Sequence, residues 1–284
     1  MWKWVRRISL GLGVLLLIAV AAVYVASEVI IRRTVRNAVP PIFASTDPAA
    51  VTRGAYQARI RGCDGCHTRN LQGEKWLDQA IQGRVWTSNL TQSVRHYSDP
   101  ELARAIRAGV RADGTALWMM PSESWTTLSD QDTADIIAWL RSHPAAGEPT
   151  PRPRFGPLLR LAVVIGKLRP ATAMVEDARS APAIDVGPAF GRGRYLAVTS
   201  CAECHGSSLK GAQANGQQTP DLVIASTYSR PEFAKFMRTG VAPDGGKRGW
   251  MSEIASEHFG QATDRDLADI HAYLVERAKR TTPE

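Results

Sequence analysis

The stretches Cys63-Asp-Gly-Cys66-His67 and Cys201-Ala-Glu-Cys204-His205 repeat one short pattern, C-x-x-C-H, in a chain of 284 residues. Together they contain all four Cys of the chain, so no Cys is left for a disulfide framework or a free nucleophile. In each stretch the two thiols stand one helical turn apart, and an imidazole follows directly. The pattern predicts two attachment points for a flat prosthetic group, each with its own imidazole ligand.

Haem is the group that this spacing fits. Two such thiols can add to the two vinyl groups on one edge of a haem, and the next residue then places its imidazole under the iron. We therefore predict two covalently bound haem c groups, one held by Cys63, Cys66 and His67, the other by Cys201, Cys204 and His205. A structural zinc site would need the two distant pairs to converge on one ion and gives the His residues no role. A thioredoxin-like redox pair would need a βαβ pattern, which the sequence lacks.

The two motifs belong to a longer duplication. Residues 97–110 align with residues 228–241, and eight of these fourteen positions are identical. The two copies, each of about a hundred residues, indicate a duplicated domain. We place the copies at residues 51–144 and 190–284. Capping boxes, proline in the first turn and closing glycines predict short helices, and strand-like alternation is scarce. The predicted fold class is therefore all-α.

A haem iron that only transfers electrons needs a second axial ligand, and each copy offers Met at the same place after an Asp-Gly pair. In the second copy this residue is Met251. In the first copy Met119 and Met120 compete, and we favour Met120 because the following proline holds the loop backbone still. His258 lies in a stretch three residues longer than its counterpart, and it stays open as a rival ligand.

The N-terminal residues 1–32 predict a transmembrane anchor, because residues 8–26 carry no charge and can cross a hydrocarbon core of roughly 30 Å. A cleaved signal peptide is the alternative, although the apolar run is longer than the usual signal core. Residues 33–50 are expected to form a juxtamembrane linker.

Residues 145–189 are expected to link the two domains, and they include an apolar segment, residues 155–168, that is too short to span a bilayer. Two placements are open for this segment, a groove between the domains or the membrane surface. The net charge of +8 lies mostly in the N-terminal segment and the linker, while each predicted domain carries only +1. This distribution argues against a nucleic-acid partner.

With these motifs, each copy resembles a class I c-type cytochrome domain, and the whole chain resembles the membrane-anchored dihaem cytochromes of bacterial electron-transport chains. The resemblance implies that the first and last helices of each domain cross at Gly54 and Gly193, near aromatic residues. It also implies that a proline carbonyl binds the proximal His. Pro220 fits that role in the second copy, whereas Ser88 replaces it in the first.

The resemblance implies a one-electron carrier that is not itself an enzyme. It would be a single-pass protein of the inner membrane with its haem domains on the periplasmic side. Redox partners would be a quinol-oxidising complex, a dehydrogenase or a terminal oxidase. Alternatively, the chain is the cytochrome subunit of a periplasmic dehydrogenase or a haem–copper oxidase. A dihaem peroxidase is disfavoured, because it needs an open or displaceable distal site and both copies offer a Met ligand.

Overall fold

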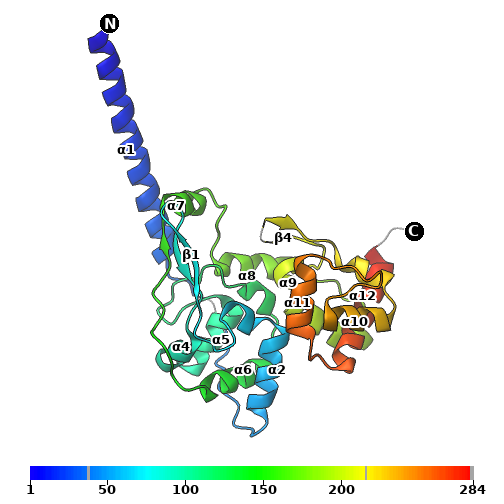
Figure 1. Ribbon diagram of the computed structural model, residues 1–284. Helices are drawn as coiled ribbons and strands as arrows, with labels where there is room; N and C mark the ends of the chain where they lie inside the picture. Colours follow the sequence, from blue (N-terminus) through cyan, green and yellow to red (C-terminus); the bar gives the residue numbers. More distant parts are fainter. Residues whose placement is uncertain (37–38, 215, 282–284) are drawn as a thin grey trace.

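The computed structural model describes residues 1–36, 39–214 and 216–281. The chain begins with a single helix, α1 (Trp2–Arg32), which projects away from the rest of the molecule (Figure 1). At 1.5 Å per residue this helix is roughly 46 Å long, and most of its apolar side chains are exposed. It is long and apolar enough to cross a membrane.

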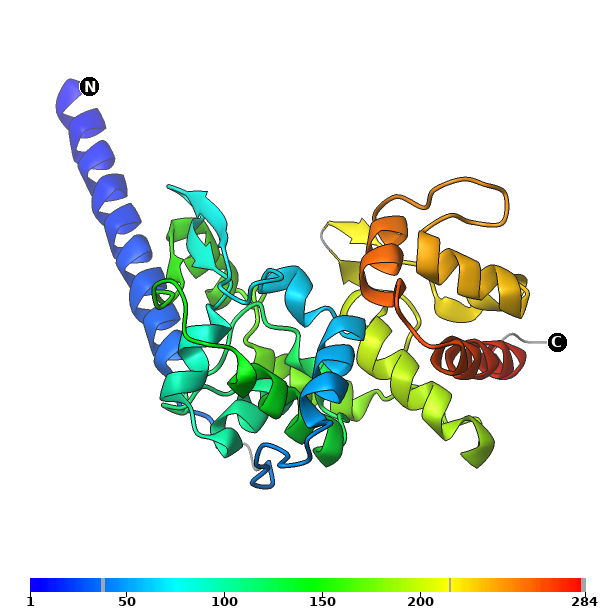
Figure 2. The same ribbon diagram turned by 60° about the horizontal axis from the view of Figure 1, so that its bottom comes forward.

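The remaining chain forms two helical domains that lie side by side in both views (Figures 1 and 2). The first contains α2 (Ala50–Ile60), α3 (Cys63–Cys66), β1 (Lys75–Gln79), β2 (Gly83–Trp86), α4 (Leu90–His96), α5 (Asp99–Ala108), the 3-10 helix η1 (Ser122–Trp125) and α6 (Asp130–Ser142). The second contains η2 (Pro188–Phe190), α9 (Gly191–His205), β4 (Gln213–Ala214), β5 (Gln217–Gln218), η3 (Leu222–Thr227), α10 (Arg230–Thr239), α11 (Trp250–Phe259) and α12 (Asp264–Thr281).

The predicted capping boxes and closing glycines are confirmed. Complete capping boxes begin α5 and α10, with the Glu101 and Glu232 side chains bonded back to the N-cap backbone. Gly109 and Gly240 end the same helices with φ angles of 67° and 68°. These left-handed conformations are accessible to glycine at little cost, so both helices stop at equivalent positions.

In each domain the first and last helices cross at a glycine, as predicted. A Cβ atom on Gly54 would lie 2.0 Å from the Asp135 carbonyl oxygen, and one on Gly193 would lie 2.0 Å from that of Asp269. Only a residue without a side chain allows this approach of α2 to α6 and of α9 to α12. The two copies therefore share one helix-crossing geometry.

The tyrosines that follow these glycines hold the two domains together. The Tyr56 hydroxyl bonds to the Asp266 carboxylate and accepts from the Thr263 backbone N–H at 3.2 Å, at the N-terminus of α12 in the other domain. Reciprocally, the Tyr195 hydroxyl donates to Asp132 Oδ2 at 2.5 Å, at the N-terminus of α6. Because each domain caps the last helix of its neighbour, the interface has an approximate two-fold symmetry.

The strands are short and sit beside the haem motifs. In the first domain β1 and β2 form an antiparallel hairpin, and β3 (Arg154–Phe155) from the linker adds a third strand next to β2. In the second domain β4 and β5 form a smaller hairpin. The expectation of a mostly helical protein is confirmed. The two short hairpins were not predicted, because strand-like alternation of apolar and polar residues is scarce in the sequence.

The linker between the domains is folded. Beyond β3 it forms α7 (Pro157–Val164) and α8 (Ala171–Ser180). Of the two placements open for residues 155–168, the groove between the domains is not the one observed, because α7 packs beside the end of α1 (Figure 1). Arg160 of α7 donates to Ser27 Oγ at 2.9 Å and to Glu28 Oε2 at 2.8 Å. These two contacts fasten α7 to the last turns of α1.

Residues 33–50, expected as a linker, pack on the first domain wherever the structure describes them; positions 37 and 38 lie outside the described residues. The Val35 backbone N–H donates to the Gly114 carbonyl at 2.8 Å, and Ile42 is buried in the first-domain core. The segment therefore adds to this domain and fixes α1 relative to it.

Candidate haem sites

The first motif is a single tight turn. Gly62 precedes it with a φ of 71°, and the turn itself, α3, runs from Cys63 to Cys66. His67 follows, and its Nδ1 lies 2.8 Å from the carbonyl oxygen of Ser88. The His67 carbonyl oxygen closes the loop, because it accepts from the Gly73 N–H at 2.9 Å.

The second motif forms the last turns of α9, and its contacts repeat those of the first. His205 Nδ1 lies 2.9 Å from the carbonyl oxygen of Pro220, and the His205 carbonyl accepts from the Gly211 N–H at 2.9 Å. The substitution of Pro by Ser88 in the first copy therefore leaves this contact in place, because the bond uses the backbone carbonyl.

The carbonyl contact prepares each imidazole to bind a metal. A carbonyl oxygen only accepts, so Nδ1 must carry the proton and Nε2 keeps its lone pair. Burial lowers the pKa of His67 and of His205 below the ordinary value, and the carbonyl only partly opposes this. Both rings are thus held neutral, which is the form that ligates iron.

None of the four Cys forms a disulfide. Burial raises the pKa of Cys63 and of Cys201 to about 12, whereas a thioredoxin-like pair requires a lowered pKa. Within the described residues no three His, Cys, Asp or Glu side chains are grouped to hold a metal ion, so the zinc alternative gains no support. A Cys pair beside a neutral imidazole whose Nε2 keeps its lone pair fits covalently attached haem.

Met119 and Met120 lie on opposite sides of their loop. Met119 has a positive φ of 65°, which turns the chain sharply between the two residues. Its side chain packs with Trp118 and Phe155, next to the linker. Met120 packs against the main core of the first domain, which also contains Leu71, four residues after His67. This placement supports Met120 as the candidate ligand.

Met251 stands in the first turn of α11 and packs against the core of the second domain. Leu209, four residues after His205, belongs to the same core. Met251 and Met120 thus have equivalent environments, although one begins a helix and the other lies in a loop. The sequences after the two Met residues reflect this difference, since Pro121 follows Met120 and Ser252 follows Met251.

Leu71 and Leu209 are a repeated pair that the motif analysis missed. Both have positive φ, 61° and 60°, and both are completely buried. Their carbonyl oxygens accept from the N–H groups of Leu90 and Leu222 at 2.7 and 3.0 Å. Strained backbone of this kind persists where packing fixes it. A repeated sequence pattern could have revealed this pair: Leu-x-Gly begins four residues after each proximal His.

His258, the open rival ligand, lies at the contact between the domains. A Cβ atom on Gly62 would lie 2.4 Å from its Cε1, and one on Gly65 would lie 3.2 Å from its Nε2. The ring of this second-domain residue therefore rests on the Cys63–Cys66 turn of the first domain. It contacts the opposite domain's motif, which sequence alignment within one copy does not reveal.

Charged groups surround the His258 ring. Burial lowers its pKa, while Asp64 and Glu257 act in the opposite direction and Arg59 assists the lowering. Arg59 and Asp64 also form an ion pair at 2.6 Å. The balance leaves His258 neutral at the interface.

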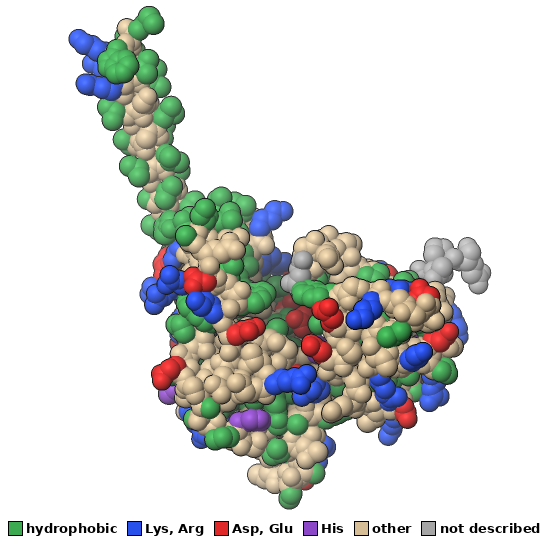
Figure 3. All heavy atoms as spheres, in the orientation of Figure 1, with side chains coloured by type: hydrophobic (Ala, Val, Ile, Leu, Met, Phe, Trp, Pro, Cys, Tyr) green, Lys and Arg blue, Asp and Glu red, His purple; other side chains and the backbone are tan. Residues whose placement is uncertain are grey.

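The two motifs face each other across this interface. Glu203, within the second motif, acts electrostatically on Cys63 and on Cys66 of the first. Burial raises the pKa of Glu203, and it raises the pKa of Glu123, within η1, to about 7. In the space-filling view, acidic side chains gather in the hollow between the domains (Figure 3). The attachment turns therefore lie on the inner faces of the domain pair.

Comparison with known proteins agrees with this geometry. The model of the family described as "Cytochrome c" matches residues 51–144 and 190–278. The "Fructose dehydrogenase cytochrome subunit" of Gluconobacter japonicus is 25% identical over 264 residues, which cover 82% of this chain and 54% of the relative. The "Alcohol dehydrogenase (quinone), cytochrome c subunit" of Gluconacetobacter polyoxogenes is 24% identical, covering 80% and 56%. The "Gluconate 2-dehydrogenase cytochrome c subunit" of Pantoea cypripedii is 24% identical, covering 80% and 59%. The chain thus spans just over half the length of these relatives.

Proposed function

Because this chain belongs to the cytochrome c family, we propose that it is a membrane-anchored dihaem electron carrier that serves as the cytochrome subunit of a dehydrogenase. The observation that carries the proposal is the repeated arrangement of a C-x-x-C-H turn, a carbonyl-bound proximal His and a core-facing Met in both domains. The proposed axial pairs are His67 with Met120 and His205 with Met251.

In this proposal the chain's own residues position two redox centres and carry out no bond-making chemistry. A c-type haem, when bound, supplies one iron that cycles between the ferric and ferrous states. The Ser88 and Pro220 carbonyls orient the proximal rings, and the soft sulfur of Met120 and Met251 would raise the potential of a bound haem. With both a His and a Met held by the protein at each iron, no position would be left for a substrate.

The relatives favour a dehydrogenase as the partner, since all three are named as cytochrome subunits of sugar, alcohol or sugar-acid dehydrogenases. A catalytic subunit would then reduce one centre, and the second would pass electrons on. Co-purification of the full chain with a dehydrogenase subunit supports this partner. Recovery with a haem–copper oxidase or a quinol-oxidising complex would transfer the proposal to that partner.

We place the haem domains on the periplasmic side, with α1 as an uncleaved anchor in the inner membrane. Lys3, Arg6 and Arg7 at the start of α1 are compatible with a cytoplasmic N-terminus. Attachment of c-type haem outside the cytoplasm supports the same orientation. Mass spectrometry of the mature chain tests whether α1 is retained, and protease accessibility in intact spheroplasts tests the side.

The ligand assignment is tested by the weak sulfur-to-iron charge-transfer band of Met-ligated ferric haem. Met120→Ala and Met251→Ala should each remove about half of the band, because each removes one of two axial sulfurs. Met119→Ala is the matched control and should keep the whole band, since Met119 packs away from the core that holds Met120. If the wild type shows only half of the band, one iron has another ligand or an open position, and the carrier proposal fails for that centre.

A further inference from the structure

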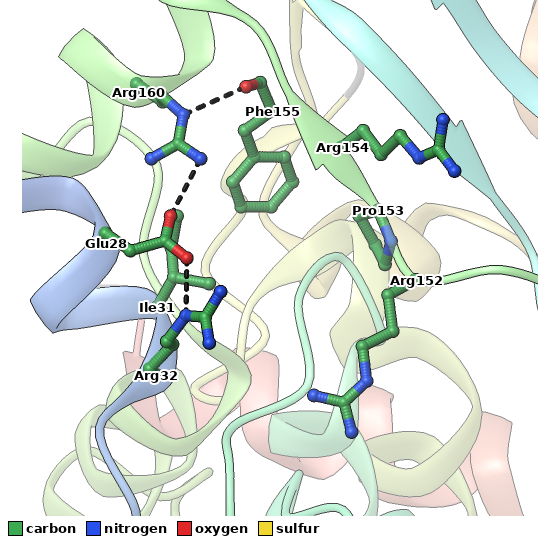
Figure 4. Close-up of a pocket in the computed structure, with 8 residues that line it drawn as sticks. All are labelled: Glu28, Ile31, Arg32, Arg152, Pro153, Arg154, Phe155 and Arg160. Carbon is green, nitrogen blue, oxygen red and sulfur yellow. Dashed lines mark hydrogen bonds and ion pairs between the residues drawn. The ribbon is translucent and has the colours of Figure 1, made fainter. Parts of the chain in front are cut away.

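A pocket of about 440 Å³ lies where the last turn of α1 meets the linker (Figure 4). Its walls come from α1 on one side and from the residues around β3 and α7 on the other. Figure 4 shows the polar side chains that line it together with one aromatic ring, and they are Glu28, Arg32, Arg152, Arg154, Arg160 and Phe155.

The pocket carries excess positive charge. Glu28 is bound by Arg160 at 2.8 Å and by Arg32 at 2.5 Å, so one carboxylate is shared by two guanidinium groups. Arg152 forms an ion pair with Asp113, and Arg154 is exposed. Four guanidinium groups therefore meet two carboxylates, which leaves an excess of two positive charges. Guanidinium groups are suited to phosphate because their planar N–H donors match its oxygens in pairs.

The surroundings of the pocket are apolar. On α1, Val29 is 67% exposed, and on α7 Leu158 and Leu161 are 47% and 42% exposed. Figure 3 shows hydrophobic side chains gathered around the base of α1, continuous with the helix itself. Arg160 also stacks over the Tyr24 ring at 4.8 Å, and tyrosine is one of the residues enriched at membrane interfaces. A cationic pocket with an apolar margin fits an amphiphile better than a free anion.

We propose that this pocket binds the phosphate headgroup of an anionic phospholipid, with the acyl chains lying along α1 and the exposed side of α7. The proposal rests on the membrane anchoring of α1 proposed above. A lipid held there seats α7 on the bilayer surface, and through β3 and the β1–β2 hairpin it fixes the first haem domain relative to the membrane. Residues 155–168 then lie on the membrane surface, which is the second of the two placements that the sequence left open.

The test uses the full-length, haem-loaded chain in a neutral detergent, titrated with short-chain phosphatidylglycerol, phosphatidylcholine or inorganic phosphate. Phosphatidylglycerol should raise the melting temperature in a saturable way, and the other two should not. Arg152→Gln with Arg154→Gln should weaken phosphatidylglycerol binding by about 30-fold, since each basic residue contributes roughly five-fold near an anionic lipid surface. Neither substitution touches the Glu28 contacts that hold α7 on α1.

Arg84→Gln is the matched control. Arg84 lies opposite Arg154 in the β2–β3 pairing and is equally a surface arginine, but it does not line the pocket. It should bind phosphatidylglycerol as the wild type does. Equal binding of phosphatidylcholine, equal binding of inorganic phosphate or an unaffected double variant would each overturn the proposal. Mass spectrometry of the mature chain reports the retention of α1 separately, so failure of the lipid proposal is distinguishable from failure of the anchoring on which it rests.

Discussion

Replacing Gly193 with Ala tests whether the contact between α9 and α12 is as close as the structure shows. The added Cβ would stand 2.0 Å from the Asp269 carbonyl oxygen and 2.8 Å from the Tyr273 Cβ. A carbon and a carbonyl oxygen approach no closer than about 3.3 Å, so the helices must separate locally by roughly 1.3 Å. Overpacking of this kind costs about 1–3 kcal/mol. The free energy of unfolding should fall by that amount, and the melting temperature by about 2–12 °C.

The control lies two residues away on the same helix. Gly191 has helical backbone angles, and a Cβ atom there would meet nothing within 4 Å. Gly191→Ala should therefore leave the melting temperature unchanged or raise it slightly, because Ala is favoured over Gly in a helix by up to about 1 kcal/mol. Thermal unfolding of the holoprotein in detergent, followed by haem circular dichroism, measures both variants. Equal melting temperatures for Gly193→Ala and Gly191→Ala would refute the close crossing.

Two further predictions concern the contact between the domains. Tyr195→Phe removes the hydroxyl that donates to Asp132, so it should cost about 1.5–3 kcal/mol of stability in denaturant unfolding, and Tyr56→Phe should cost a similar amount; no loss in either variant would contradict the reciprocal interface. Burial lowers the pKa of His258, so the unfolded chain binds more protons below about pH 6.5 and stability should fall as the pH drops through that value. His258→Gln should flatten this part of the profile of melting temperature against pH, and an unchanged slope would show that other groups cause it.

Local features were the ones that the sequence predicted well. The capping boxes at Ser98 and Ser229 and the glycines at the helix crossings are fixed by interactions within a few residues or by a steric requirement that only glycine meets. The proximal His assignment stays a prediction that rests on the position of each His directly after its own Cys pair, and the structure shows only that each Nδ1 contacts a backbone carbonyl. The carbonyl partner of His67 was less certain, since a serine stands where proline is usual, yet the backbone supplies the contact.

Arrangements between distant segments were harder to predict. The sequence predicted aromatic residues near the helix crossing within each domain, but the hydroxyl groups of two of them, Tyr56 and Tyr195, reach the opposite domain. Repeats align residues within equivalent copies and say nothing about how the copies are docked. His258 was uncertain for the same reason, because its contacts are on the other copy. The position of α7 could not be chosen either, since an apolar segment pairs equally well with any apolar surface.

The docking has a consequence for electron transfer between the two proposed centres. Met251 and His258 are seven residues apart on α11, so they lie two turns apart on nearly the same face of the helix. One end of α11 holds the proposed iron ligand of the second domain, while the other end rests on the haem-attachment turn of the first. Ile60, from the first domain, is also buried in the second-domain core. Packed side chains and a continuous helix therefore connect the two proposed centres across the domain interface.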